Sequence, residues 1–123
     1  MSAVAQTLND FGKSVGLPSL RFSPQGAAAL DVQGLGTLGF EAVQQEVIIF
    51  LARTIPPFTE GALHRALQSC QPSHGYPFTV QAALKGDDLL LFAARLPETE
   101  FSLPNIDRAV RLLEQLHKHA LTP

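Results

Sequence analysis

Two unbroken apolar runs dominate the hydrophobic pattern of this chain. The first, Val47–Leu51, lies inside Gln45–Arg53 (QEVIIFLAR), and the second is Leu89–Ala94 (LLLFAA). Successive side chains of a strand point to opposite faces, so an unbroken apolar run makes both faces of its strand apolar. Both runs are short and rich in β-branched, aromatic and leucine residues, and Pro56-Pro57 follows the first. They therefore predict strands rather than helices.

Alternating apolar and polar positions predict the rest of a sheet. Ala27–Gln33 and Thr37–Ala42 flank the turn Gly34–Gly36 and precede the central strand, Glu46–Arg53. Further on, Gly86-Asp87-Asp88 joins Phe78–Leu84 to Leu89–Leu96 as a hairpin. Short connections imply that the first three strands form an antiparallel meander.

Helical spacing predicts three helices. Residues 3–16 carry an apolar stripe, Gly16 is suited to the position just after the helix, and Pro18 prevents its continuation. A short middle helix of about eleven residues is expected after Thr59, which would cap it, with Glu60 in its first turn. The last helix has Pro104 in its first turn. The three apolar stripes are Val4, Leu8, Phe11 and Val15; Leu63, Ala66, Leu67 and Cys70; and Leu103, Ile106, Val110, Leu113, Leu116 and Ala120.

These elements predict one α+β domain over residues 1–123, in the order helix, three strands, helix, two strands, helix. Its twisted, mainly antiparallel sheet would carry the helices on one face, because the short middle helix cannot cover the other. Ile48, Phe50 and Ala52 on one face and Val47, Ile49 and Leu51 on the other would then not both be buried. A partner chain or bound segment is expected to cover the second face. The alternative is a helix folding over each face within one chain.

Composition excludes several classes of function. The 123 residues carry a net charge of −2, no Trp and one Tyr, which argues against nucleic-acid binding. The single cysteine, Cys70, excludes an internal disulfide and fits a reducing cytosol. The N-terminal residues lack the pattern of a secretory signal, and no apolar run approaches the roughly 20 residues that span a bilayer. We expect a soluble, cytoplasmic protein without stable membrane insertion.

Candidate chemical motifs do not add up to a catalytic, cofactor or metal site. Gly34–Gly39 (GLGTLG) matches a dinucleotide-binding pattern, but a strand rather than a helix follows it, so we interpret it as a turn. His117 and His119 lie two apart on a helix, do not face each other, and are expected to be surface histidines. His64, His74 and Cys70 have no known zinc-binding spacing. We therefore predict no enzymatic activity, no cofactor and no metal.

Three strings resemble a known family, the class I chaperones of bacterial type III secretion. They are LNDFGKSVGLPSL (Leu8–Leu20), LLLFAARLPE (Leu89–Glu98) and SLPNIDRAVRLLEQL (Ser102–Leu116). Together with the order of elements and the final HALTP, they are most similar to the SycN-type subunit. That resemblance implies a helix–β3–helix–β2–helix fold that dimerises. In that branch the chaperone pairs with a YscB-type sister, and the pair holds a YopN-type secretion gatekeeper.

The resemblance implies a non-enzymatic function, in which the dimer binds the N-terminal segment of a secreted gatekeeper or effector in extended form. A net charge of only −2 and the short middle helix favour a heterodimer with a second small chaperone subunit over a homodimer. The alternative is a small ligand-binding or regulatory domain without a secretion client. The residues expected to bind the client are Val4, Leu8, Phe11, Leu30, Val32, Leu38 and Phe40. Replacing Leu38 and Phe40 by Asp is expected to abolish client binding while leaving the chain folded. The residues expected at the chaperone–chaperone interface are Leu63, Leu67 and Phe78.

Overall fold

The computed structural model describes residues 2–56, 59 and 61–122. Within these residues the chain forms three α-helices, five strands and two short 3-10 turns, Pro72–His74 and Glu98–Glu100. In chain order the helices and strands are α1 (Ala3–Ser14), β1 (Ala27–Val32), β2 (Gly36–Val43), β3 (Glu46–Thr54), α2 (Ala62–Ser69), β4 (Thr79–Lys85), β5 (Leu89–Pro97) and α3 (Leu103–Leu121). None of the helices in the described part is long and apolar enough to cross a membrane.

The strands form one antiparallel sheet in the order β1-β2-β3-β5-β4. The predicted meander and hairpin are confirmed, and the hairpin strand β5 inserts between β3 and β4. The central strand β3 pairs on both sides: Ile49 lies opposite Phe40 of β2 and opposite Ala94 of β5. The strand that carries the first of the two unbroken apolar runs is thus the middle strand of the sheet.

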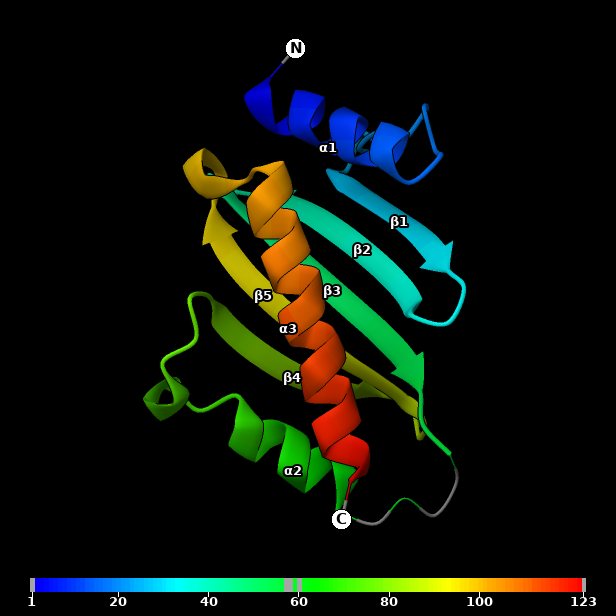
Figure 1. The fold of residues 1–123 in the computed structure, drawn as a ribbon, viewed down its shortest axis with the longest axis vertical. Helices are drawn as coiled ribbons and strands as arrows, with labels where there is room; N and C mark the ends of the chain where they lie inside the picture. The colour runs from blue at the N-terminus through cyan, green and yellow to red at the C-terminus, as the bar shows by residue number, and fades with distance from the viewer. Residues whose placement is uncertain (1, 57–58, 60, 123) are drawn as a thin grey trace.

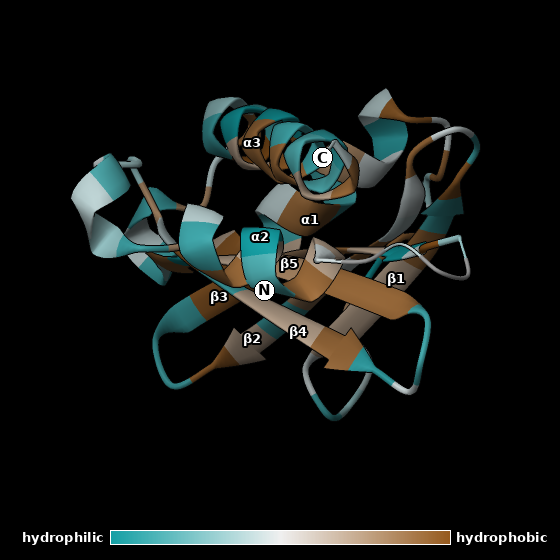
Figure 2. Cartoon of the chain, turned by 90° about the horizontal axis from the view of Figure 1, so that it is seen from below, coloured by the Kyte–Doolittle hydropathy of each residue, from teal (hydrophilic) through white to brown (hydrophobic). Residues whose placement is uncertain are grey.

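All three helices lie on the same side of the sheet, as predicted (Figures 1 and 2). The long helix α3 crosses the sheet diagonally, α1 lies toward the β1 end and α2 lies beside β4 (Figure 1). Within residues 2–56, 59 and 61–122, no helix covers the opposite side, which we call the outer face. The alternative of one helix on each face is therefore not the arrangement of this chain.

The core fills the space between the sheet and the helices. Val47, Ile49 and Leu51 of β3 are fully buried there, together with Leu90 and Phe92 of β5. Fully burying a side chain of this size stabilises the fold by about 1.5–3 kcal/mol. Packing against this surface, rather than intrinsic propensity, holds the short helices in place.

Phe40 of β2 packs against both α1 and the segment that leads into α3. Its ring meets Phe11 of α1 edge-on, with centroids 5.5 Å apart, and meets Phe101, just before α3, at 6.1 Å. Edge-to-face aromatic pairs at such distances add to the stabilisation from burial alone. Helix α1 is therefore anchored through its aromatic side chain to the centre of the core.

The middle helix is shorter than predicted and begins later. It has eight residues, and its N-cap is Gly61, whose φ of 75° suits glycine. Thr59 does not cap it; its hydroxyl donates to the carbonyl of Pro56 at 2.7 Å. Glu60, predicted in the first helical turn, lies outside the described residues.

Four residues of the predicted apolar stripes are exposed: Val15, Leu103, and Leu63 and Leu67 of α2. Val15 is 48% exposed because α1 ends at Ser14, and Gly16 then takes the predicted left-handed conformation with φ 84°. Leu103 is 42% exposed because it is the first residue of α3 and precedes the part of that helix that packs on the sheet.

The prediction that His117 lies at the surface is wrong. Its side chain is 1% exposed, and its Nε2 lies 2.7 Å from the carbonyl oxygen of Leu51. The physical reason is helical spacing: His117 follows Leu113 by four residues, so both project from the same face of α3. His119, two residues further on, is exposed as predicted.

The outer face is apolar but only half-buried. Its large side chains, Ile48, Phe50, Leu89 and Leu91, are contributed by β3 and β5. Phe50 lies across Gly39 of β2, its cross-strand neighbour, and a Cβ on Gly39 would overlap the Phe50 ring. Gly39 therefore gives the ring a place to lie flat against the sheet.

Replacing Gly39 by Ala should lower the free energy of unfolding by about 1–3 kcal/mol, the usual cost of overpacking, because the Phe50 ring must leave the sheet. In a Phe50→Ala background the same replacement should cost little, since nothing then occupies that space. Urea denaturation of the two single variants and the double variant measures this coupling. An equal cost of Gly39→Ala in both backgrounds would contradict the proposed contact.

Candidate protein-binding surfaces

Apolar side chains remain uncovered at both edges of the sheet. One cluster lies where α1 leads into β1, and the other lies where α2 meets β4. Both β1 and β4 are edge strands, each pairing with one neighbour among the described residues. An unpaired strand edge beside apolar side chains is a typical site for another polypeptide to dock.

The first surface, the β1 groove, has a volume of about 490 Å³. It is lined by Leu17, Pro18, Ser19 and Leu20 of the connector and by Ala29, Leu30 and Asp31 of β1. Leu17 is 41% exposed. Because this groove follows a free strand edge, an extended chain placed in it would meet both backbone groups and apolar side chains.

A close approach of the connector to α1 shapes the β1 groove. The amide of Leu17 donates to the carbonyl of Gly12 at 2.6 Å, so the chain folds back over the end of the helix. A Cβ on Gly12 would overlap the Leu17 carbonyl and the Leu20 side chain. Gly12 thus allows Leu17 and Leu20 to lie beside β1, and Pro18 stiffens the segment between them.

The second surface consists of the α2 edge and the adjoining β4 groove. The α2 edge is formed by Leu63 and Leu67, which are 37% and 51% exposed. The β4 groove, about 430 Å³, begins at Leu67 and continues past β4 to Leu91 and Ala93 on the outer face. This makes the α2 edge and part of the outer face one continuous apolar surface.

Cys70 contributes to the β4 groove as an apolar group. It is the C-cap of α2 and is half-buried. Burial raises the pKa of its thiol, and this effect outweighs the opposing hydrogen bond from Ser69. A thiol that stays protonated is a poor nucleophile, so the groove offers packing rather than cysteine chemistry.

Charged groups contribute little to holding these surfaces in shape. On the outer face Arg95 and Glu46 form an ion pair at 3.8 Å with both side chains 44% exposed, and exposed pairs of this kind contribute little. Beside the β1 groove, Asp31 accepts a hydrogen bond from Thr37 at 2.7 Å. The two surfaces therefore offer mainly apolar side chains and a strand edge.

The predicted client-binding residues do not form one exposed surface. Leu8, Leu38 and Phe40 are fully buried in the core. They offer no surface to a client in this structure, and replacing Leu38 or Phe40 by Asp would bury an unpaired charge and unfold the chain. In place of the prediction that such variants stay folded, we expect them to unfold.

The other four predicted client-binding residues, Val4, Phe11, Leu30 and Val32, are partly buried against the core. Of these, Leu30 lines the β1 groove. Sequence reasoning missed Leu17, Pro18 and Leu20. The available signal was a pair of leucines flanking a proline directly after the end of a helix.

The residues predicted for the chaperone–chaperone interface lie near one another. Leu63 and Leu67 form the α2 edge. Phe78 is partly buried just before β4 and lines a neighbouring pocket that also includes Cys70. These three residues therefore surround the same end of the sheet, and their role as an interface remains a prediction.

Comparison with known proteins identifies the family. The family described as "Type III secretory system chaperone SycN" matches residues 3–121. No curated protein sequence matches the chain.

Solved structures of low sequence identity share the fold. One is the crystal structure of the Yersinia pestis type III secretion chaperone SycH in complex with a stable fragment of YscM2. The matching chain has a TM-score of 0.73 at 16% identity, and the match covers 95% of this chain and 99% of that one. The HopA1–SchA chaperone–effector complex has a TM-score of 0.72 at 16% identity, covering 95% and 92%. The ExsC–ExsE complex has a TM-score of 0.72 at 18% identity, covering 95% and 87%.

The family match covers nearly the whole chain and agrees with the order of helices and strands described above. It also agrees with the resemblance carried by the first helix, the β5 strand and the last helix. This chain belongs to the SycN family of type III secretory system chaperones.

Proposed function

We propose that this protein is a non-enzymatic cytoplasmic chaperone, working as one half of a heterodimer. It binds the N-terminal segment of a type III secreted gatekeeper or effector in extended form and keeps that segment competent for secretion. The observation that carries the proposal is the presence of two separate apolar surfaces at opposite edges of one sheet. One surface serves the client and the other serves the sister subunit.

The β1 groove suits an extended client segment. Its β1 side offers a free strand edge, and its connector side offers the exposed side chain of Leu17. Pairing with a strand edge supplies main-chain hydrogen bonds without demanding a particular client sequence. Apolar side chains of the client then add the burial that offsets the entropy lost when a flexible segment becomes ordered.

The α2 edge and β4 groove suit the sister subunit. They join exposed helix side chains, a strand edge and part of the outer face into one surface. Helix α2 has only eight residues, fewer than predicted, so it presents little self-complementary helix surface to a second copy. The low net charge of −2 likewise favours a sister of different composition.

The comparisons favour this function over a small ligand-binding or regulatory domain. The family description names a type III secretory system chaperone, and solved structures with the same fold are described as chaperones bound to partner proteins. Identities of 16–18% to those structures support the fold alone. The client and the sister subunit of this chain are therefore our proposal.

Leu17→Asp should weaken client binding at least about tenfold, a loss of about 1.4 kcal/mol, because it places a charge in the β1 groove. Leu103→Asp is the matched control, since Leu103 is a leucine of similar exposure, 42% against 41%, on another part of the surface. Calorimetric titration with the N-terminal segment of the secreted protein that co-purifies with the wild-type chain measures both. Equal affinities for the two variants would refute the assignment of the β1 groove.

Leu67→Glu should dissociate the chaperone dimer while leaving the chain folded, because it buries a carboxylate in the interface but lies exposed in the free chain. Sedimentation of the purified complex should report the mass of one subunit for this variant and of two for Leu103→Glu. Circular dichroism checks that both variants are folded. If Leu67→Glu sediments as a dimer, the α2 edge is not the interface.

A further inference from the structure

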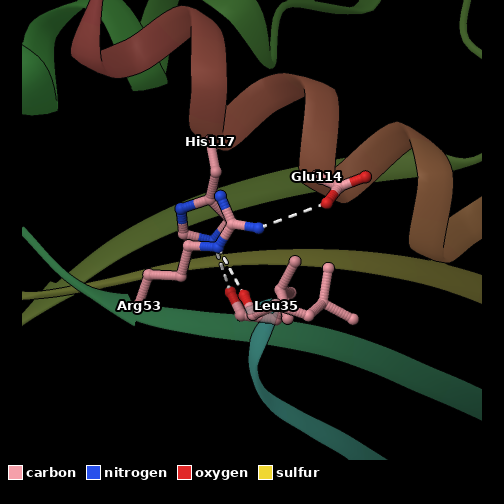
Figure 3. Close-up of polar contacts among 5 residues, drawn as sticks. Leu35, Arg53, Glu114 and His117 are labelled. Atoms are coloured by element: carbon pink, nitrogen blue, oxygen red, sulfur yellow. Dashed lines mark hydrogen bonds and ion pairs between the residues drawn. The ribbon is translucent and has the colours of Figure 1, made fainter. Parts of the chain in front are cut away.

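His117 lies at the contact between the C-terminal half of α3 and the central strand. Its Nε2 donates to the carbonyl of Leu51 at 2.7 Å, and its ring meets Phe92 of β5 edge-on with centroids 4.8 Å apart. The side chain is 1% exposed. A single hydrogen bond therefore joins α3 to the backbone of β3 inside the core (Figure 3).

A fixed cation lies beside this histidine. Arg53 of β3 donates through Nε to the carbonyl of Leu35 in the β1–β2 turn, and its Nη2 lies 3.4 Å from Oε2 of Glu114 on α3 (Figure 3). Each of the other elements packed on this part of α3 contributes a different group. From β5 the histidine meets Phe92, and from α2 the nearby charged side chain is Arg65, which donates to the carbonyl of Ala120 at 2.8 Å.

This environment favours the neutral imidazole. Burial lowers the pKa of His117 below its ordinary value of 6.5; the bond to Leu51 opposes that effect, and the positive charge of Arg53 adds to it. Protonation would place a second positive charge in the core beside Arg53. The carboxylate of Glu114 is already bound to that arginine.

A movement of α3 would be transmitted to α2, because the two helices are in contact. Buried alanines, Ala62 and Ala66 of α2 and Ala120 of α3, allow the two helices to pack closely. The Arg65–Ala120 hydrogen bond joins them one turn from His117. The exposed leucines of the α2 edge lie on the helix that this contact positions.

We propose that His117 is a proton-operated latch, which holds the C-terminal half of α3 on the sheet when neutral and favours its opening when protonated. Through the contact between α3 and α2, the latch also controls the α2 edge and so the affinity for the sister subunit. This second step rests on the proposed function of the α2 edge. The first step is independent of it.

The direction of the pH effect follows from the lowered pKa. In the closed form the C-terminal half of α3 lies on the sheet, and in the open form it has left the sheet and His117 is in water. His117 of the open form takes up a proton near pH 6.5, whereas His117 of the closed form takes it up only at lower pH. Closure is therefore most favourable above pH 6.5 and is weakened progressively as the pH falls below that value. At one pH unit below the open-state pKa, the opening equilibrium can rise by at most about tenfold from this one group.

The experiment compares amide hydrogen exchange of α3 at pH 7.5 and pH 5.5 in the wild-type chain, in His117→Gln and in His119→Gln. Glutamine keeps a donor for the Leu51 carbonyl but cannot take up a proton, and His119 is an exposed histidine on the same helix. Opening of residues around 113–120, corrected for intrinsic exchange, should increase severalfold at pH 5.5 in the wild type and in His119→Gln. In His117→Gln it should not change. Equal increases in all three proteins overturn the latch.

The NMR titration of the His117 ring in the wild-type chain gives a test that needs no variant. A pKa well below 6.5 supports the latch, and an ordinary pKa overturns it. The dimer mass of the same samples then separates the two steps. If α3 opens at pH 5.5 but the sister subunit stays bound, the latch stands and its link to the α2 edge fails.

Discussion

The two-sided apolar character of β3 is the constraint on which the rest of the structure depends. Val47, Ile49 and Leu51 face the helices and are fully buried, whereas Ile48 and Phe50 face the opposite way and are half-buried. A single layer of helices covers the apolar surface of a strand that has one apolar face, but it covers only one of the two apolar faces of β3. Because all three helices of the described part lie on one side of the sheet, no helix covers the apolar side chains of its outer face.

Most of the fold follows from patterns that depend on local spacing. The strand order of the meander, the hairpin of β4 and β5, the C-terminal glycine of α1 and the proline at the start of α3 all follow from periodicity and turn residues. The turn between β2 and β3 was less predictable, because Gln44 and Gln45 take positive φ values of 49° and 70° without the usual Asn-Gly signal.

The candidate site was less predictable because it depends on tertiary burial. Leu38 and Phe40 have the same alternating pattern as a strand with an exposed apolar face, but α1 and the segment before α3 cover Phe40 through Phe11 and Phe101. His117 looked like a surface residue near a helix end until α3 was placed on the sheet. Conversely, Leu17 and Leu20 stand in an irregular segment without periodicity, and only the close approach at Gly12 brings them beside β1.

The central claim is that one chain uses two edges of its sheet for two different partners. Native mass spectrometry of the tagged chain, purified from the cells that produce it, tests that claim most directly. The account predicts a complex of one copy of this chain, one copy of a second small subunit and one secreted protein. A complex of two copies of this chain with the secreted protein, or the chain alone, would contradict it.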